Sequence, residues 1–273
     1  MTAASPVTAT GAHLTYTELA AYRQDGYCVR RAVFSAAELD RLRAAVEAAA
    51  NVARELASRP DSRSYLLDGR RFVDHGHHTI QFEYGDDTTA IKVIEPVHDL
   101  VPELQQLVRD PRLCVPMQQL LGSESLALWT AKLNLKRPGI GTGFGWHQDS
   151  PYWVHDCAHS VDQLPNVMVA LDAATVENGC LRVIRGSHRG GCLPGTADGS
   201  QLGGFYTDPA CFDVDQQVAL EVPAGSLVFF DPHIVHGSRP NTSDQARRAL
   251  VVTVQPGGYP ALKSRRVEQL ADT

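Results

Sequence analysis

Residues 139–153 read GIGTGFGWHQDSPYW, which places a histidine and an aspartate two positions apart, at His147 and Asp149. In an extended strand, side chains two positions apart point to the same face. An imidazole and a carboxylate on one face can bind one metal ion. A second histidine from elsewhere would complete the two-histidine, one-carboxylate set that holds non-haem Fe(II) in oxygenases. The stretch therefore predicts a metal site that still needs a third ligand.

The residues around this pair favour a lined cavity over an exposed edge. Five glycines and prolines lie between positions 138 and 145, which predicts a mobile loop leading into the strand. The aromatic side chains of Trp146, Tyr152 and Trp153 surround the polar pair. A lone HxD tripeptide is more often two surface residues, so the metal interpretation depends on these flanks and on a third ligand.

Composition excludes several classes of protein. The 273 residues are 43% hydrophobic and 21% charged, which suits a globular domain with a sizeable core. The 25 basic and 31 acidic residues give a net charge of −6, which argues against a nucleic-acid binder. No apolar run approaches the ~18–20 residues of a membrane span. We expect a disordered lead at 1–14 and one domain at 15–273.

The cellular compartment is predicted from the N-terminal sequence and from the spacing of the cysteines. The first residues show no basic region followed by an apolar one, so they do not resemble a secretory signal. The six cysteines include no CxxC pair, which makes a zinc ribbon unexpected. A cytoplasmic protein with reduced thiols is predicted, either a monomer or a homodimer.

The first part of the chain predicts helices. Capping-box patterns begin at Thr15 and Ser35. The first helix ends at Gly26 and a strand follows over 27–34. The second helix runs for about five turns with one apolar stripe and ends before Pro60. Two further helices are predicted over 100–109 and 110–121.

Residues 60–90 are polar and irregular, and we interpret them as a loop or lid. They contain His75, His77 and His78, but no predicted strand or helix fixes these rings, so no metal cluster is predicted here. The segment 81–84 is a candidate cover for a pocket.

Short apolar runs bounded by glycine, proline, asparagine or aspartate fill the second part of the chain. They predict strands over 126–135, 166–171, 180–184, 218–222, 226–230 and 248–254. Many short strands are typical of a sandwich or jelly roll. Helices followed by strands favour a mainly β member of the α+β class.

Two histidines compete to be the third ligand. The segment 231–241 reads DPHIVHGSRPN and offers His233 and His236. The next strand begins with Arg247 and Arg248, and an arginine beside an iron site could bind a carboxylate cosubstrate through a bidentate pair.

At this point the chain resembles the phytanoyl-CoA dioxygenase family of Fe(II)/2-oxoglutarate oxygenases. The motifs HxD at 147–149 and HGSxxNxS at 236–243, followed by Arg247, carry the resemblance. DGYCV at 25–29, ENGCL at 177–181 and GSH at 186–188 agree with it. The resemblance covers about residues 17–255, nearly the whole domain.

The resemblance implies a fold and a set of site residues. The family fold is a double-stranded β-helix, a jelly roll with helices packed on one sheet. Fe(II) would be bound by His147, Asp149 and His236. The cosubstrate 2-oxoglutarate would be contacted by Arg247, Ser238, Asn134 and Lys92. His233 would then be a loop residue near the site, and His188 a structural turn residue.

The same resemblance implies the chemistry. With O2 as second cosubstrate, oxidative decarboxylation of 2-oxoglutarate would give succinate and CO2 while an unactivated C–H bond of a small molecule is hydroxylated. We expect a bacterial secondary metabolite, as in antibiotic biosynthesis. The presence of Asp149 disfavours halogenation, because halogenases of related fold lack this carboxylate.

Other outcomes stay open at this stage. The substrate radical could be diverted to ring closure or epimerisation. A non-catalytic jelly-roll binding protein is the alternative from another class. A cupin-type isomerase would more commonly present His-x-His with a nearby glutamate, which the HQD sequence does not match.

Two further predictions concern side-chain direction. A mixed pocket wall is predicted from four residues near the metal strand or lid: Phe82, Gln148, Tyr152 and Trp153. In the last long strand, hydrophobicity alone would turn Arg248 inward. Small and polar neighbours, Ala249 and Thr253, instead favour Arg247 as the inward cation, because they leave room for a ligand.

Overall fold

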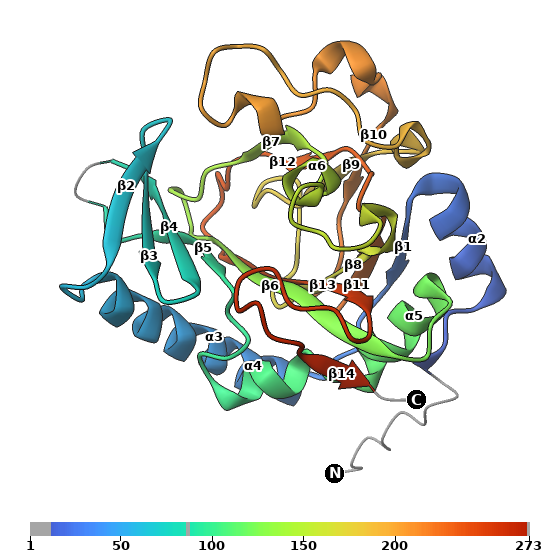
Figure 1. Ribbon diagram of the computed structural model, residues 1–273, viewed down its shortest axis with the longest axis horizontal. Helices are drawn as coiled ribbons and strands as arrows, with labels where there is room; N and C mark the ends of the chain where they lie inside the picture. The colour runs from blue at the N-terminus through green and yellow to red at the C-terminus, as the bar shows by residue number, and fades with distance from the viewer. Residues whose placement is uncertain (1–11, 86–87, 272–273) are drawn as a thin grey trace.

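The computed structural model describes residues 12–85 and 88–271 and consists of two facing antiparallel sheets with helices outside the larger one (Figure 1). The larger sheet runs, in spatial order, β1 (Tyr27–Arg30), β11 (Leu227–Phe230), β8 (Asn166–Ala170), β13 (Arg247–Pro256), β6 (Leu126–Lys136), β5 (Ile91–Glu95), β4 (His78–Tyr84), β3 (Arg70–His75) and β2 (Arg63–Leu67), with β14 (Gln269–Ala271) also on β6. The smaller sheet runs β10 (Gln217–Leu220), β9 (Leu181–Ile184), β12 (His236–Ser238) and β7 (Phe144–His147). This is the predicted jelly roll.

Local sequence signals set the helix boundaries. The helices are α2 (Tyr16–Asp25), α3 (Ala36–Ala57), α4 (Pro102–Leu107), α5 (Pro111–Leu121) and α6 (Ser150–Trp153). Single 3-10 turns lie at η1 (Val161–Gln163), η2 (Ser187–Gly190), η3 (Gly203–Phe205), η4 (Pro209–Cys211) and η5 (Val214–Gln216). Both predicted capping boxes form, at Thr15 and at Ser35. Within residues 12–85 and 88–271, no helix combines the length and the apolarity that crossing a membrane requires.

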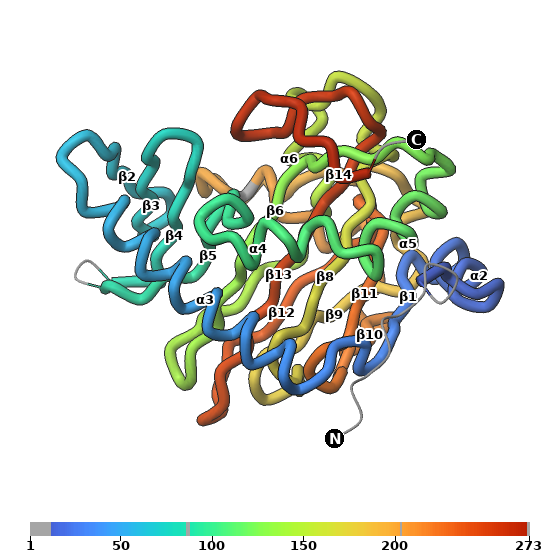
Figure 2. The backbone as a smooth tube through the Cα atoms, turned by 90° about the horizontal axis from the view of Figure 1, so that it is seen from below, coloured from blue at the N-terminus to red at the C-terminus, as the bar shows by residue number. Residues whose placement is uncertain are grey.

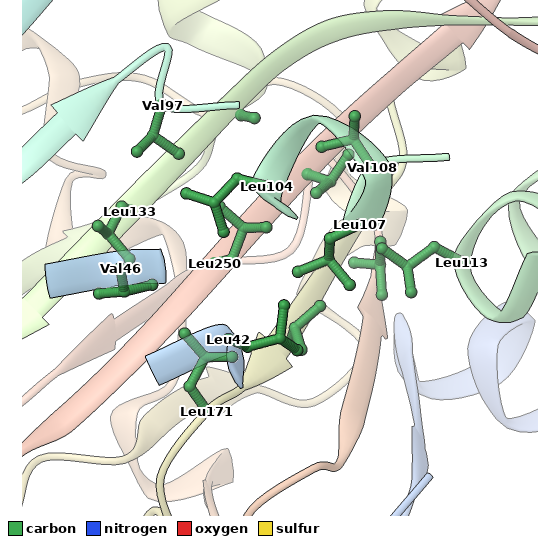
Figure 3. Close-up of a cluster of buried hydrophobic side chains, with 14 of the residues drawn as sticks. Leu42, Val46, Val97, Leu104, Leu107, Val108, Leu113, Leu133, Leu171 and Leu250 are labelled. Atoms are coloured by element: carbon green, nitrogen blue, oxygen red, sulfur yellow. The ribbon is translucent and has the colours of Figure 1, made fainter. Parts of the chain in front are cut away.

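The outer face of the larger sheet is covered by α3, α4 and α5, which lie across its strands in Figure 2. Figure 3 shows the core between them, where Leu42 and Val46 of α3 and Leu104 of α4 meet Leu133 of β6 and Leu250 of β13. Side chains alternate along a strand, so the neighbours of Leu133 and Leu250 point the other way, between the two sheets. That inner space holds a second apolar cluster and, at one end, the candidate site.

Residues 60–90 are not the loop that the sequence predicts. Strands β2, β3 and β4 form an antiparallel meander that extends the larger sheet beyond β5. The turn between β2 and β3 is Asp68-Gly69, with φ of 47° and 72°, as a two-residue hairpin turn requires. The meander is only partly buried, which explains why its apolar residues alternate weakly and why the prediction failed.

The ends of other predicted elements shift as well. Strand β1 stops at Arg30, four residues earlier than predicted. The strand predicted around His147 forms as β7 but ends at that residue, whereas β5, β12 and β14 were not predicted. Of the predicted disordered lead, 1–11 lies outside the described residues. Leu14, however, is 4% exposed, and its N–H donates to Gln119 Oε1, so the packed chain begins before residue 15. All six cysteines are free.

Candidate metal centre

The pairing of β7 with β12 brings the two histidines together. His147 ends β7, His236 begins β12, and the two residues are register partners with ring centroids 4.1 Å apart. A β-carbon at Gly237 would lie 3.0 Å from the carbonyl oxygen of Phe144, so a glycine beside His236 lets β12 approach β7 this closely.

Asp149 joins them from just outside the strand. It is the residue before α6, with φ −77° and ψ −34°, rather than part of an extended strand as predicted. Its Oδ2 lies 3.9 Å from His236 Nε2. One ligand atom from each of His147, Asp149 and His236 lies within 4.8 Å of the others, so one ion could contact all three.

The outer nitrogens of both rings are held by backbone carbonyls. Nδ1 of His147 is 2.8 Å from the carbonyl oxygen of Gly145, and Nδ1 of His236 is 3.0 Å from that of Ile234. A carbonyl only accepts, so each Nδ1 carries the proton and each Nε2 presents a lone pair. Burial, and then the nearby His236, lower the pKa of His147 to about 3. A neutral imidazole with a free lone pair is what a metal ion needs.

The Asp149 carboxylate is oriented by its own partners. Asn166 Nδ2 donates to Asp149 Oδ2 at 3.1 Å, and Thr253 Oγ1 donates to Asn166 Oδ1 at 2.5 Å. The amine of Lys132 lies 3.6 Å from Asp149 Oδ1. Burial opposes ionisation of Asp149, but Lys132 and the two histidines outweigh it and lower its pKa, so the carboxylate is charged.

A cavity of about 240 Å³ opens on these three side chains, and Arg247 lines it. Arg247 is 3% exposed, and its Nη2 contacts Met168 Sδ at 3.3 Å. Throughout the described residues it has no carboxylate within ion-pair distance, and burial lowers its pKa to about 10. Arg248 points outward, with Nε 2.8 Å from Asp172 Oδ2 and Nη1 3.2 Å from Glu47 Oε1. The side-chain directions on β13 are those predicted.

Other predicted cosubstrate contacts divide into two groups. Asn134 and Ser238 line the cavity with Arg247. Lys92 does not, because β5 turns Val93 to the cavity and Lys92 away from it. The Lys92 amine donates to Thr142 Oγ1 at 2.5 Å and to the Gly143 carbonyl at 2.7 Å, and burial lowers its pKa to about 7.

Of the predicted pocket wall, only Tyr152 lines the cavity. Phe82 packs in the core under the helices, with the Arg71 guanidinium 3.7 Å from its ring centroid. Gln148 is fully buried and bonds to the backbone of the loops around 191–193 and 233. Trp153 packs edge-on against Trp129, with ring centroids 6.3 Å apart. Closeness in sequence did not determine the direction of these side chains.

The two remaining predicted histidines have structural partners. His233 Nε2 lies 2.6 Å from Asp162 Oδ1, so its ring is engaged outside the three-residue group. His188 Nε2 lies 3.1 Å from the carbonyl oxygen of Arg23, in the turn where the sequence predicts a structural histidine.

Several cavity residues were missed by sequence reasoning. They come from the unpredicted meander, from neighbouring strands and from the loop before η4: Arg70, Phe72, Val93, Glu95, Lys132, Leu202 and Tyr206. Gln81 also lines the cavity and belongs to the segment 81–84 that was predicted to cover a pocket. An HxD-centred search cannot find them. The Asp68-Gly69 hairpin signal would have placed alternate residues of β3 on the sheet's inner face.

A second group of metal-type ligands lies outside the cavity lining, at the β3–β4 turn. His77 Nε2 is 2.6 Å from Asp99 Oδ2, and His78 Nδ1 is 3.0 Å from the Pro96 carbonyl oxygen. His77, His78 and Asp99 have ligand atoms within 4.8 Å of one another. The expectation that no element fixes these rings is therefore wrong, because β4 begins at His78.

Comparison with known proteins agrees with this geometry. The model of the phytanoyl-CoA dioxygenase (PhyH) family matches residues 22–249. L-proline trans-4-hydroxylase of Streptomyces griseoviridis is 30% identical over 184 residues, which cover 62% of this chain and 68% of that protein.

Two solved structures share the fold. EctD from S. alaskensis with bound Fe superposes with a TM-score of 0.66 and 25% identity, covering 94% of this chain and 83% of that one. The carbocyclase SnoK from nogalamycin biosynthesis gives a TM-score of 0.63 and 23% identity, covering 93% and 88%. With the family model matching most of its length, the chain belongs to the phytanoyl-CoA dioxygenase family of Fe(II)/2-oxoglutarate-dependent oxygenases.

Proposed function

We propose that this dioxygenase hydroxylates an unactivated C–H bond of a small molecule, with Fe(II) held by His147, Asp149 and His236. The observation that carries the proposal is the position of these ligands on a cavity that also contains an unpaired buried arginine, Arg247. A buried cation without a partner is costly, and the distal carboxylate of 2-oxoglutarate would supply that partner.

Different residues of the site would orient the metal ligands and bind the cosubstrate. When bound, iron, 2-oxoglutarate and O2 supply an oxidant that removes hydrogen from a C–H bond. The carbonyls of Gly145 and Ile234 hold the two imidazoles in the tautomer that exposes Nε2. Arg247 would bind the distal carboxylate, with Ser238 and Asn134 beside it on the lining. Tyr152, which also lines the cavity, stacks on Phe205 with centroids 4.4 Å apart.

The small-molecule substrate follows from the cavity and from the relatives. A volume of about 240 Å³ falls below the ~300–1,000 Å³ common for drug-sized ligands. One relative is by name a hydroxylase of L-proline. The prediction of a bacterial secondary metabolite stays a prediction. It is supported by the fold shared with SnoK, a carbocyclase from nogalamycin biosynthesis.

The test is turnover with product identification. Purified protein with Fe(II), 2-oxoglutarate and O2 should release succinate, and a true substrate should gain one oxygen atom in mass spectrometry. A product that loses two hydrogen atoms would indicate ring closure, and one of unchanged mass but altered stereochemistry would indicate epimerisation. Metal binding without succinate release in any condition would favour the non-catalytic alternative.

Asn166 offers a graded test of the metal centre. Asn166→Ala removes the amide that orients Asp149, so we expect Fe(II) affinity to fall by about 10–100-fold, as for other outer-shell partners. The matched control is Asn178→Ala, because Asn178 is equally buried but bonds only to the 173–175 turn. The control should lower the melting temperature and leave Fe(II) affinity unchanged. Equal Fe(II) affinity in both variants would contradict the role given to Asn166.

A further inference from the structure

Arg70 is a second buried cation on the wall of the same cavity. It begins β3, is 8% exposed, and lies with its guanidinium 4.3 Å from the ring centroid of Tyr84. Its Nε is buried without a hydrogen-bond partner. Among residues 12–85 and 88–271, no carboxylate pairs with it, whereas Arg248 and Arg43 both pair with Asp172. Arg70 therefore has unused donors at the cavity.

Arg70 and Arg247 stand at opposite sides of this cavity. A row of register partners runs across five strands, from Phe72 through Gln81, Val93 and Asn134 to Ala249. Arg70 lies two residues before Phe72, and Arg247 two residues before Ala249. Four strand spacings of about 4.8 Å put the backbones of the two arginines roughly 19 Å apart along the sheet. The two side chains therefore enter the cavity from opposite ends of this row, and 2-oxoglutarate bound between Arg247 and the metal ligands would leave Arg70 for a second anion.

The charges on the lining lead to the same conclusion. Its cations are Arg70, Lys132 and Arg247, and its carboxylates are Glu95 and Asp149. Lys132 lies within 4.0 Å of both carboxylates and so already has partners. Fe(II) and the 2-oxoglutarate dianion cancel each other. One positive charge then remains on the cavity lining, and it is neutralised if the substrate is an anion.

A loop on the cavity lining is tied to the hairpin that carries Arg70. Asp68, in the turn before Arg70, accepts hydrogen bonds from the backbone N–H groups of Gln201 and Leu202 at 2.9 and 2.7 Å. Leu202 in turn lines the cavity. Because Arg70 is itself only 8% exposed, a charge-assisted hydrogen bond at its guanidinium would be little screened by water.

Arg70 lines the same cavity as the three proposed metal ligands, and Tyr152 lines it as well. The ring centroid of Tyr152 is 6.0 Å from that of His147. A ligand in this cavity can therefore contact Arg70 at one end and approach the metal ligands at the other.

We propose that Arg70 binds the acidic group of the substrate, a carboxylate or a phosphonate, and that the enzyme therefore acts on small organic acids. This inference rests on the proposed function, because it names the substrate class of that same site. A substrate anchored at Arg70 by one end would present its other carbons toward His147 and Asp149. The guanidinium geometry favours planar, bidentate contact with such a group.

The variants Arg70→Gln and Arg70→Lys test the proposal, with Arg71→Gln as the matched control. Arg71 is adjacent but faces the opposite side of the sheet, where it packs on Phe82 and donates to the Thr88 carbonyl. The probes are short amino acids and short fatty acids, each beside its primary amide, and 2-aminoethylphosphonate beside ethylamine. The readout is succinate release above the rate without probe, at saturating Fe(II) and 2-oxoglutarate.

In the wild-type enzyme, at least one acid should stimulate succinate release and its uncharged counterpart should not. The carboxylate and phosphonate probes show which of the two acids is used. Arg70→Gln should raise the KM for that acid about tenfold or more, with the 2-oxoglutarate requirement changed by less than about twofold. Arg70→Lys should retain part of the affinity, and Arg71→Gln should match the wild type. Anaerobic titration calorimetry with the same acid should show the same loss as a change in Kd.

Three results would overturn the inference: stimulation by amides as strong as by acids, no stimulation by any acid probe, or equal effects of Arg70→Gln and Arg71→Gln. A wild-type protein that never converts 2-oxoglutarate to succinate would be a different failure. It would remove the proposed function itself, and this inference with it.

Discussion

Alanine in place of His236 is expected to abolish stoichiometric Fe(II) binding and, with it, succinate formation. The loss should exceed the ~10–100-fold typical of an outer-shell partner, because His236 would be a direct ligand. Its Nε2 is the atom left free by the Nδ1 contact with Ile234, and no other imidazole among the described residues lies within reach of both His147 and Asp149. Fe(II) binding is measured by equilibrium dialysis and turnover by succinate release.

The matched control for this experiment is His233→Ala, three residues earlier on the same segment. The His233 ring is engaged with Asp162, and Gln148 bonds to its backbone carbonyl, a contact that alanine keeps. This variant should retain one Fe(II) per chain. An iron-free His233→Ala protein beside an active His236→Ala protein would show that the wrong histidine had been assigned.

The second large effect is expected at Arg247. Arg247→Ala should raise the 2-oxoglutarate concentration needed for half-maximal turnover by roughly a hundredfold or more, since breaking a buried charged pair costs ~3–5 kcal/mol. Arg248→Ala should change this requirement only slightly, because Arg248 is bound to Asp172 and Glu47 on the helix side. Titration of succinate formation against 2-oxoglutarate measures both variants.

The effect on thermal stability should be larger for Arg248→Ala than for Arg247→Ala, the reverse of the effect on the 2-oxoglutarate requirement. Arg248→Ala leaves the half-buried carboxylate of Asp172 without one of its partners, so the melting temperature of this variant should fall more than that of Arg247→Ala. A rise in the 2-oxoglutarate requirement confined to Arg248→Ala would contradict the assignment of Arg247 to the cosubstrate.

Local signals account for what the sequence predicts well. A capping box involves four adjacent residues, so the starts of α2 and α3 are visible without knowledge of the fold. Strand parity is equally local. The small and polar residues on the same face as Arg247 led to the prediction that Arg247 points inward and Arg248 outward. In the structure Arg247 lines the cavity and Arg248 pairs with Asp172 on the outer side.

Non-local packing accounts for what the sequence missed. The hairpin that carries Arg70 is tied through Asp68 to a loop more than a hundred residues away, and no local pattern reports that contact. Trp153 is near His147 along the chain, and Phe82 follows the cavity residue Gln81, yet both side chains point into other cores. The short strand β12 carries the proposed ligand His236 but is too brief for an alternating pattern.

The position of the bound iron is the most direct test of the three assigned ligands. Anomalous diffraction from crystals soaked anaerobically with Fe(II), recorded on both sides of the iron absorption edge, locates the metal without reference to activity. We expect one strong anomalous peak in the cavity, bounded by His147 Nε2, His236 Nε2 and the carboxylate of Asp149. A peak at His77, His78 and Asp99, with none in the cavity, would contradict it.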